Sequence, residues 1–138
     1  MIKVIFSTTG GIGSRLLRVM MASPYSHCGI VAGDDVIEAS THGVRVVSLY
    51  DFIRGSTKHE VCEYEGDNDA AVAAALKQVG KPYDWLGVAG VAAQRNWQDD
   101  DCWFCSELAA YALRAGGMCP VRLDADRITP RDLWVCGK

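Results

Sequence analysis

The residue best suited to covalent chemistry in this sequence is Cys105, because of its position relative to a predicted helix. A polar stretch ends at Asp101, and apolar residues at helical spacing follow the cysteine: Leu108, Ala109, Tyr111, Ala112, Leu113 and Ala115. This pattern predicts a helix over 104–116 with the thiol in its first turn. Unpaired backbone N–H groups and the positive end of the helix dipole there favour thiolate over thiol. The sequence therefore predicts a nucleophile at this position.

A cysteine nucleophile needs a base, and the chain offers three histidines: His27, His42 and His59. The best placed is His27, which begins an apolar and β-branched run over 27–32. Such a run predicts a strand, and a strand holds an imidazole in a fixed direction. Taken alone, a strand histidine is more often structural, because one hydrogen bond satisfies it. The pairing with Cys105 is what favours a catalytic role.

The group that orients this imidazole is predicted on the next strand, over 35–40. A short hairpin-like connection joins it to the first strand, and the resulting register allows Glu38 to lie beside His27. A carboxylate there accepts the second imidazole N–H and stabilises the imidazolium. Ser40 lies two residues on and on the same face, so it is the alternative. Glu38 is favoured because an anion stabilises imidazolium better than a hydroxyl does.

Cys102 and Cys105 also form a Cys-x-x-Cys pair, a spacing that serves redox couples and zinc sites. A thioredoxin-like pair stands between an early strand and a helix of a βαβ pattern, whereas this pair follows a loop in the last third. A structural zinc site needs four ligands, and the cysteines considered as further ligands are scattered singly: Cys62, Cys119 and Cys136. We therefore expect no metal and no cofactor, although oxidation can link Cys102 to Cys105.

Four segments follow one another in an informative order. They are His27-x-Gly29-Ile30, Val36-Ile37-Glu38-Ala39-Ser40 with Gly43-Val44, Gly80-Lys81-Pro82-Tyr83-Asp84-Trp85, and Trp103-Phe104-Cys105-Ser106-Glu107-Leu108. Together they resemble the circularly permuted branch of the NlpC-type papain-like cysteine hydrolases. In the unpermuted enzymes the cysteine helix precedes the histidine strand, whereas the permuted order is histidine, polar residue, cysteine. The resemblance covers about residues 25–135, and the four segments in order are more specific than any one.

This resemblance implies a papain-like α+β fold, circularly permuted, in which an antiparallel β-sheet packs against helices. It implies Cys105 as the nucleophile, His27 as the base and Glu38 at the orienting position, which varies in the family. Tyr83 matches a tyrosine that packs near the active cleft in relatives, although a plain packing role for it stays open. With Trp103 and Ser40, it is predicted to contact substrate. The implied substrate is an amide, ester or thioester carbonyl, with cell-wall peptide the commonest target of the superfamily.

Other functions and substrates remain open from the sequence. The sequence also allows an inactive papain-like module for binding or assembly and, less favourably, a thiol-redox protein using Cys102 and Cys105. A cytoplasmic isopeptide or a lipid ester competes with cell-wall peptide as the substrate. Selective reaction of Cys105 with an alkylating reagent near pH 6 separates catalysis from binding, because only a thiolate reacts fast there.

The composition is that of one compact enzyme domain. With 138 residues, 49% of them hydrophobic and 22% charged, residues 1–138 are expected to form a single domain with its own core. The net charge of −3 shows no excess of basic residues of the kind that binds nucleic acid. Six cysteines without an export signal are expected to be free thiols. The sequence does not indicate an oligomeric state.

The apolar run at the amino terminus is too short for a secretory signal. No stretch reaches the roughly 18 uncharged apolar residues of a membrane span. We therefore expect a protein that is cytoplasmic as synthesised and not an integral membrane protein. Reaching the cell wall would require phage lysis or another export route, so a phage or prophage origin is predicted by analogy alone.

Predicted strands cluster in the first half of the chain, which favours an α+β arrangement over alternating βαβ units. The strands are expected near 2–7, 27–32, 35–40, 43–48 and 60–65. Helices are expected near 12–22, 48–54, 67–79, 85–94 and 104–116. A final helical turn is expected from Thr129, with Pro130 at its first position.

Overall fold

The computed structural model describes residues 1–84, 103–119 and 128–138. Within these residues, five strands form one antiparallel sheet in the order β4-β3-β2-β1-β5. The strands are β1 (Ile2–Thr8), β2 (His27–Ala32), β3 (Asp35–Ser40), β4 (Gly43–Ser48) and β5 (Lys58–Tyr64). The predicted α+β class with an antiparallel sheet is confirmed. The assignment of residues 1–138 to a single domain stays a prediction.

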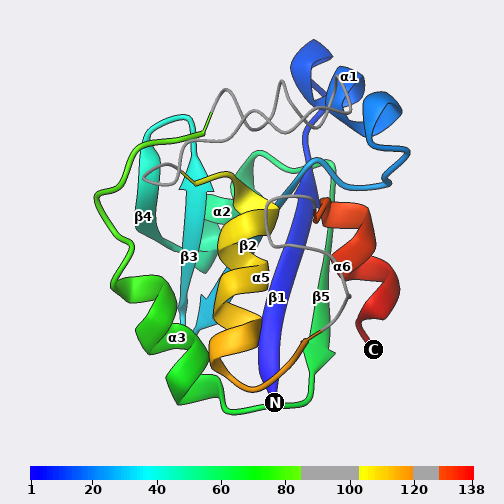
Figure 1. Ribbon diagram of the computed structural model, residues 1–138. Coiled ribbons are helices and arrows are strands. Elements are labelled where there is room, and N and C mark those ends of the chain that lie inside the picture. Colours follow the sequence, from blue (N-terminus) through cyan, green and yellow to red (C-terminus); the bar gives the residue numbers. More distant parts are fainter. Residues whose placement is uncertain (85–102, 120–127) are drawn as a thin grey trace.

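The described helices cover the two faces of the sheet unequally. They are α1 (Ile12–Met20), α2 (Leu49–Arg54), α3 (Asn68–Leu76), α5 (Cys105–Ala115) and α6 (Pro130–Cys136). Figure 1 shows α3, α5 and α6 on one face, α2 on the other, and α1 beyond the end of the sheet that is remote from both termini. None of the described helices is long and apolar enough to cross a membrane.

The main core lies between α5 and the sheet, because the alternation of each strand sends its apolar side chains to that face. Ile30 of β2 pairs with Ile37 of β3, and both are fully buried. On the helix side, Leu108, Ala112 and Leu113 are buried against them in the same cluster. The opposite face of these strands carries His27, Glu38 and Arg45.

Most predicted elements agree with the structure to within two residues. The helix expected over 67–79 is shorter, since α3 ends at Leu76 and hydrogen-bonded turns continue to Gly80, whose φ of 93° ends the helical path. The helix predicted near 85–94 lies outside the described residues. The helix predicted near 12–22 forms as α1, but no residue along α1, all of which is described, is buried.

Gly43 joins the sheet to the segment that leads to Tyr83. Its φ is +88°, and a Cβ built on it would lie 2.6 Å from the backbone oxygen of Lys81. Two backbone hydrogen bonds hold this segment against Val44: the Val44 N–H donates to Lys81 O at 2.8 Å, and the Gly80 N–H donates to Val44 O at 2.9 Å. Only glycine fits both the left-handed conformation and this close approach.

We expect Gly43→Ala to lower the free energy of unfolding by roughly 2–4 kcal/mol, combining left-handed strain with steric overlap. Gly33→Ala is the matched control, because Gly33 also has a positive φ, of 65°, but has no atom within 4 Å of a built Cβ. Its expected loss is roughly 1–2 kcal/mol, from backbone strain alone. Urea unfolding of both variants measures the difference, and equal losses would contradict the proposed overlap.

Candidate active site

Cys105 is the first residue of α5, as the sequence predicts. Phe104 precedes it in extended conformation, and its backbone N–H donates to the Glu107 side chain at 3.4 Å, which closes the first turn. Ser106 anchors the same turn, since its hydroxyl donates to the carbonyl of Ile128 at 2.6 Å. The Cys105 residue is 7% exposed. The start of the helix is therefore anchored by these two hydrogen bonds, and Cys105 lies at the edge of the core.

His27 and Glu38 meet on the sheet face that α2 covers. The hairpin register pairs Gly29 with Glu38, so the carboxylate lies diagonally across from His27. His27 Nε2 donates to Glu38 Oε2 at 2.6 Å, which is the contact predicted from the hairpin. Phe52 of α2 stacks on the imidazole, with ring centres 5.3 Å apart and an angle of 23° between the planes. The imidazole is thus fixed by a hydrogen bond at one edge and by an aromatic ring on one face.

Arg45 extends this contact, and the sequence predictions did not include it. The next hairpin pairs Glu38 with Arg45, and Arg45 Nε donates to Glu38 Oε1 at 2.8 Å. The Glu38 side chain is only 6% exposed, so it is a nearly buried carboxylate with a cation on each oxygen. Burial alone raises the pKa of Glu38, but the hydrogen bonds and charges of His27 and Arg45 outweigh burial and lower it.

The other side of the imidazole hydrogen-bonds the Cys105 side chain. Burial acts to lower the pKa of His27, but hydrogen bonds and charges from Cys105 and Glu38 outweigh it and raise the pKa of His27 to about 10. Since Nε2 is taken by Glu38, Nδ1 is the ring nitrogen left for the sulfur. The arrangement favours a thiolate beside an imidazolium, which is a nucleophile and a proton donor in contact.

A second thiol, Cys28, hydrogen-bonds the Cys105 sulfur, and the sequence analysis assigned it no role in the site. It is fully buried. The pKa of the Cys105 thiol is held well below its usual value, first by a hydrogen bond from the Cys28 side chain, against the effect of burial, and then by His27. The backbone N–H of Cys28 donates to the same sulfur. Burial raises the pKa of Cys28 well above its usual value, so Cys28 stays a thiol and a donor.

Tyr83 and Trp103 are brought together beside Cys105 by a short parallel bridge. The Trp103 N–H donates to Pro82 O at 3.0 Å, and the Asp84 N–H donates to Trp103 O at 2.9 Å. Burial raises the pKa of the Tyr83 hydroxyl, and the nearby Cys105 and Cys28 sulfurs raise it further. Tyr83 therefore lies near the nucleophile, with Trp103 beside it, and the substrate contacts predicted for both residues stay predictions.

Ser40, the alternative orienting residue, has a different partner. Its hydroxyl accepts from the His42 backbone N–H at 3.2 Å, within the turn that follows β3. Of the two candidates, Glu38 is the one hydrogen-bonded to His27. Cys102, Trp85 and Trp97 lie outside the described residues, so the predicted link between Cys102 and Cys105 stays a prediction.

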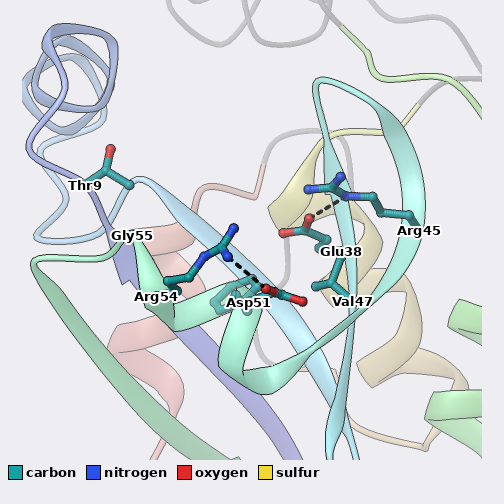
Figure 2. Close-up of a pocket in the computed structure, with 8 residues that line it drawn as sticks. Thr9, Glu38, Arg45, Val47, Asp51, Arg54 and Gly55 are labelled. Carbon is teal, nitrogen blue, oxygen red and sulfur yellow. Dashed lines mark hydrogen bonds and ion pairs between the residues drawn. The ribbon is translucent and has the colours of Figure 1, made fainter.

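A cavity of about 480 Å³ lies on the α2 side of the Glu38 carboxylate. It is lined by Thr9, Glu38, Arg45, Val47, Asp51, Phe52, Arg54 and Gly55. Figure 2 shows both guanidinium groups already paired, Arg45 with Glu38 and Arg54 with Asp51. The cavity therefore lies beside the orienting carboxylate, and each arginine that lines it is paired with a carboxylate that also lines it.

Residues 3–122 match the model of a family described as the permuted papain-like amidase enzyme, YaeF/YiiX, C92 family. This chain belongs to that family. A search of curated proteins found no match. The predicted kinship with circularly permuted papain-like cysteine hydrolases is confirmed, and the C92 family is one of amidase enzymes.

A solved structure supports the same fold for this C92 chain. It is described as the crystal structure of metalloprotein yiiX from Escherichia coli O157:H7, and it is 25% identical in sequence. The match has a TM-score of 0.70 and covers 86% of this chain and 67% of that one. In the described part of the present chain, no group of three or more His, Cys, Asp or Glu side chains is arranged to hold a metal ion.

Proposed function

We propose that this C92 protein hydrolyses an amide bond in a peptide substrate through an acyl-enzyme on Cys105. The Cys105 thiolate attacks the carbonyl carbon, and the C–N bond breaks as the His27 imidazolium gives its proton to the leaving amine. Neutral His27 then takes a proton from water, whose oxygen attacks the thioester carbonyl. The carboxylic acid leaves, and thiolate and imidazolium are restored.

The observation that carries this proposal is the contact of one imidazole with both partners. His27 hydrogen-bonds Cys105 on one side and donates to Glu38 at 2.6 Å on the other. Glu38 is in turn held by Arg45 at 2.8 Å. In this role Glu38 fixes the tautomer of His27 and stabilises its positive charge during the reaction.

The oxyanion that forms on the substrate needs hydrogen-bond donors. The backbone N–H of Cys105 is one proposed donor, because N–H groups of a first helical turn have no partner within the helix. The Trp103 indole N–H is the second proposed donor, since it is buried and has no hydrogen-bond partner in the part of the chain that is described. Trp103, Tyr83 and Ser40 are the residues proposed to contact the bound peptide.

A peptide amide is the substrate class to test first, because the family is one of amidases. Cell-wall peptide is the proposed physiological form of that class, and delivery to the wall from a phage or prophage setting stays a prediction. The competing lipid-ester substrate also stays a prediction.

Alkylation by iodoacetamide near pH 6 tests the proposed ion pair without any knowledge of the substrate. We expect Cys105 to be alkylated at least roughly tenfold faster than the exposed thiol of Cys119, because the hydrogen bonds and charge around Cys105 hold it as a thiolate. His27→Ala should reduce this advantage, because the sulfur then keeps only the hydrogen bonds from Cys28. Peptide mass mapping of the labelled protein identifies the site. Equal labelling of the thiols would favour the binding-module alternative.

The pH profile of hydrolysis follows from the same pair. The folded pKa of His27 is raised from 6.5 to about 10, so the imidazolium persists well above neutral pH and is lost as the pH rises through about 10. We therefore expect kcat/KM to fall on the alkaline side near that value. Glu38→Gln should move this fall to lower pH, because it removes a charge that stabilises the imidazolium. A fall near pH 6.5 in the wild type would contradict the pairing.

A further inference from the structure

Helix α1 is the described part of the molecule whose exposure least matches its sequence. Four apolar residues at helical spacing lie in solvent: Ile12 at 86%, Leu16 at 58%, Val19 at 78% and Met20 at 46% exposed. At 100° per residue, these side chains fall on one side of the helix. An apolar stripe of this kind on a soluble protein marks a contact surface.

The opposite side of α1 holds the helix to the body of the protein, and it does so through polar groups. The Ser14 hydroxyl shares hydrogen bonds with the hydroxyls of Thr8 at 3.0 Å and Ser26 at 2.7 Å. A surface helix ordinarily packs its apolar side inward and turns its polar side to water. In α1 this orientation is inverted, so the fold presents the apolar stripe outward.

The charge of α1 indicates which partner the stripe fits. The helix contains two basic residues, Arg15 and Arg18, and no acidic residue, although the whole chain carries a net charge of −3. Arg15 is exposed and lies one turn from Val19, at the border of the stripe. An apolar stripe bordered by arginine is the pattern of helices that lie in the interface of an anionic membrane.

We propose that α1 binds the surface of an anionic phospholipid bilayer, with Ile12, Leu16 and Val19 inserted among the acyl chains. The lipid supplies the apolar contact that the stripe lacks within the described part of the chain, and the negative charge that Arg15 and Arg18 attract. This inference does not depend on the proposed hydrolysis.

The position of α1 relates this surface to the candidate active site. Ser26, which is hydrogen-bonded to Ser14, directly precedes His27 in the chain. Figure 1 shows α1 beyond the end of the sheet where β1 ends and β2 begins. A bilayer bound to α1 would therefore lie at the end of the molecule that holds the imidazole, which fits a substrate presented at a membrane surface.

Co-sedimentation of the full chain with lipid vesicles tests the proposal. We expect binding to vesicles of phosphatidylcholine mixed with phosphatidylglycerol, and at least roughly tenfold weaker binding to vesicles of phosphatidylcholine alone. Arg15→Gln combined with Arg18→Gln should weaken binding by roughly fivefold for each arginine and should remove its salt dependence. Ile12→Ser combined with Val19→Ser should abolish it.

The control is Val135→Ser on α6, because Val135 is 64% exposed but lies outside the stripe, so its variant should bind as the wild type does. Circular dichroism of each variant reports that it is folded, and a Cys105→Ala chain should bind vesicles normally, which keeps this test separate from catalysis. Equal binding to both vesicle types, or no binding, would overturn the proposal. A dimer in lipid-free solution that Ile12→Ser and Val19→Ser convert to monomer would assign the stripe to a second copy instead.

Discussion

Replacing Cys105 with serine is expected to lower kcat/KM for peptide amide hydrolysis by on the order of 10³-fold or more, because the reaction then loses its nucleophile. A serine hydroxyl at this position is not ionised by the imidazole in the way the thiol is, since the hydroxyl is a far weaker acid. The fold should survive the change, because the two side chains differ by one atom and α5 is held independently by Ser106 and Glu107. The measurement is the release of free amine from a panel of peptide amides.

The matched control for this loss is Cys119→Ser, which makes the same chemical change at an exposed thiol. It should leave kcat/KM within roughly twofold of the wild type, as expected for a surface substitution. Cys28→Ala separates the two sulfurs of the site. It should retain the acyl-enzyme route but react more slowly, because the thiolate loses a hydrogen-bond donor. Hydrolysis that survives Cys105→Ser unchanged would rule out the assignment of the nucleophile.

Replacing Glu38 with glutamine is expected to give the second large effect, a fall in kcat/KM of on the order of 10²–10⁴-fold. Glutamine is similar in shape, but it is neutral, so the imidazolium loses its stabilising charge. Arg45 would also lose the carboxylate that it holds at 2.8 Å. The rate should therefore fall mainly in kcat, and the alkaline limit of the pH profile should move downward with it.

Ser40→Ala serves as the control for the orienting role, because Ser40 is the residue that the sequence leaves as the alternative. Its hydroxyl accepts a hydrogen bond from the backbone of the turn and makes no hydrogen bond to His27 in the described structure. We expect Ser40→Ala to lower kcat/KM far less than Glu38→Gln does and to leave the alkaline limit of the pH profile unchanged, because it removes at most a substrate contact and no hydrogen bond to His27. A large loss with Ser40→Ala and none with Glu38→Gln would transfer the orienting role to the serine.

The strands and the Glu38 contact could be predicted because hairpin register is determined locally. The connection at Gly33 is short enough to fix which residues of β2 and β3 face each other, and the alternation of side chains then places Glu38 beside His27. The start of α5 could be predicted as well, since the change from a polar stretch to apolar residues at helical spacing locates it within one residue. These features depend on few neighbours along the chain.

Arg45, Phe52 and Cys28 were not predicted, and the reasons differ. Arg45 could have been found from the same register logic applied to the second hairpin, which pairs it with Glu38. Phe52 could not, because the side of the sheet that α2 covers depends on tertiary packing. Cys28 lies in an apolar strand, where a cysteine is usually a small core residue, and the packing of α5 on β2 is what brings its thiol to Cys105. Side-chain contacts between distant segments need the assembled fold.

The orientation of α1, with its apolar stripe toward solvent, could not be predicted from the sequence. Its apolar periodicity predicts the helix but not the direction in which the stripe points, because an amphipathic pattern is the same whether the stripe faces a core or solvent. The hydrogen bonds of Ser14 to Thr8 and Ser26 determine that direction, and they join segments that the pattern treats separately.

The most direct test of the central claim is the ultraviolet absorbance of the thiolate, measured against pH as the difference between the wild type and Cys105→Ala. We predict that Cys105 is already ionised at neutral pH and that its absorbance disappears only on acidification well below the usual thiol range. His27→Ala should move this disappearance to higher pH, because Cys105 then keeps only the hydrogen bonds from Cys28. A wild-type difference signal that appears only near the ordinary thiol pKa of about 8.5 would contradict the account.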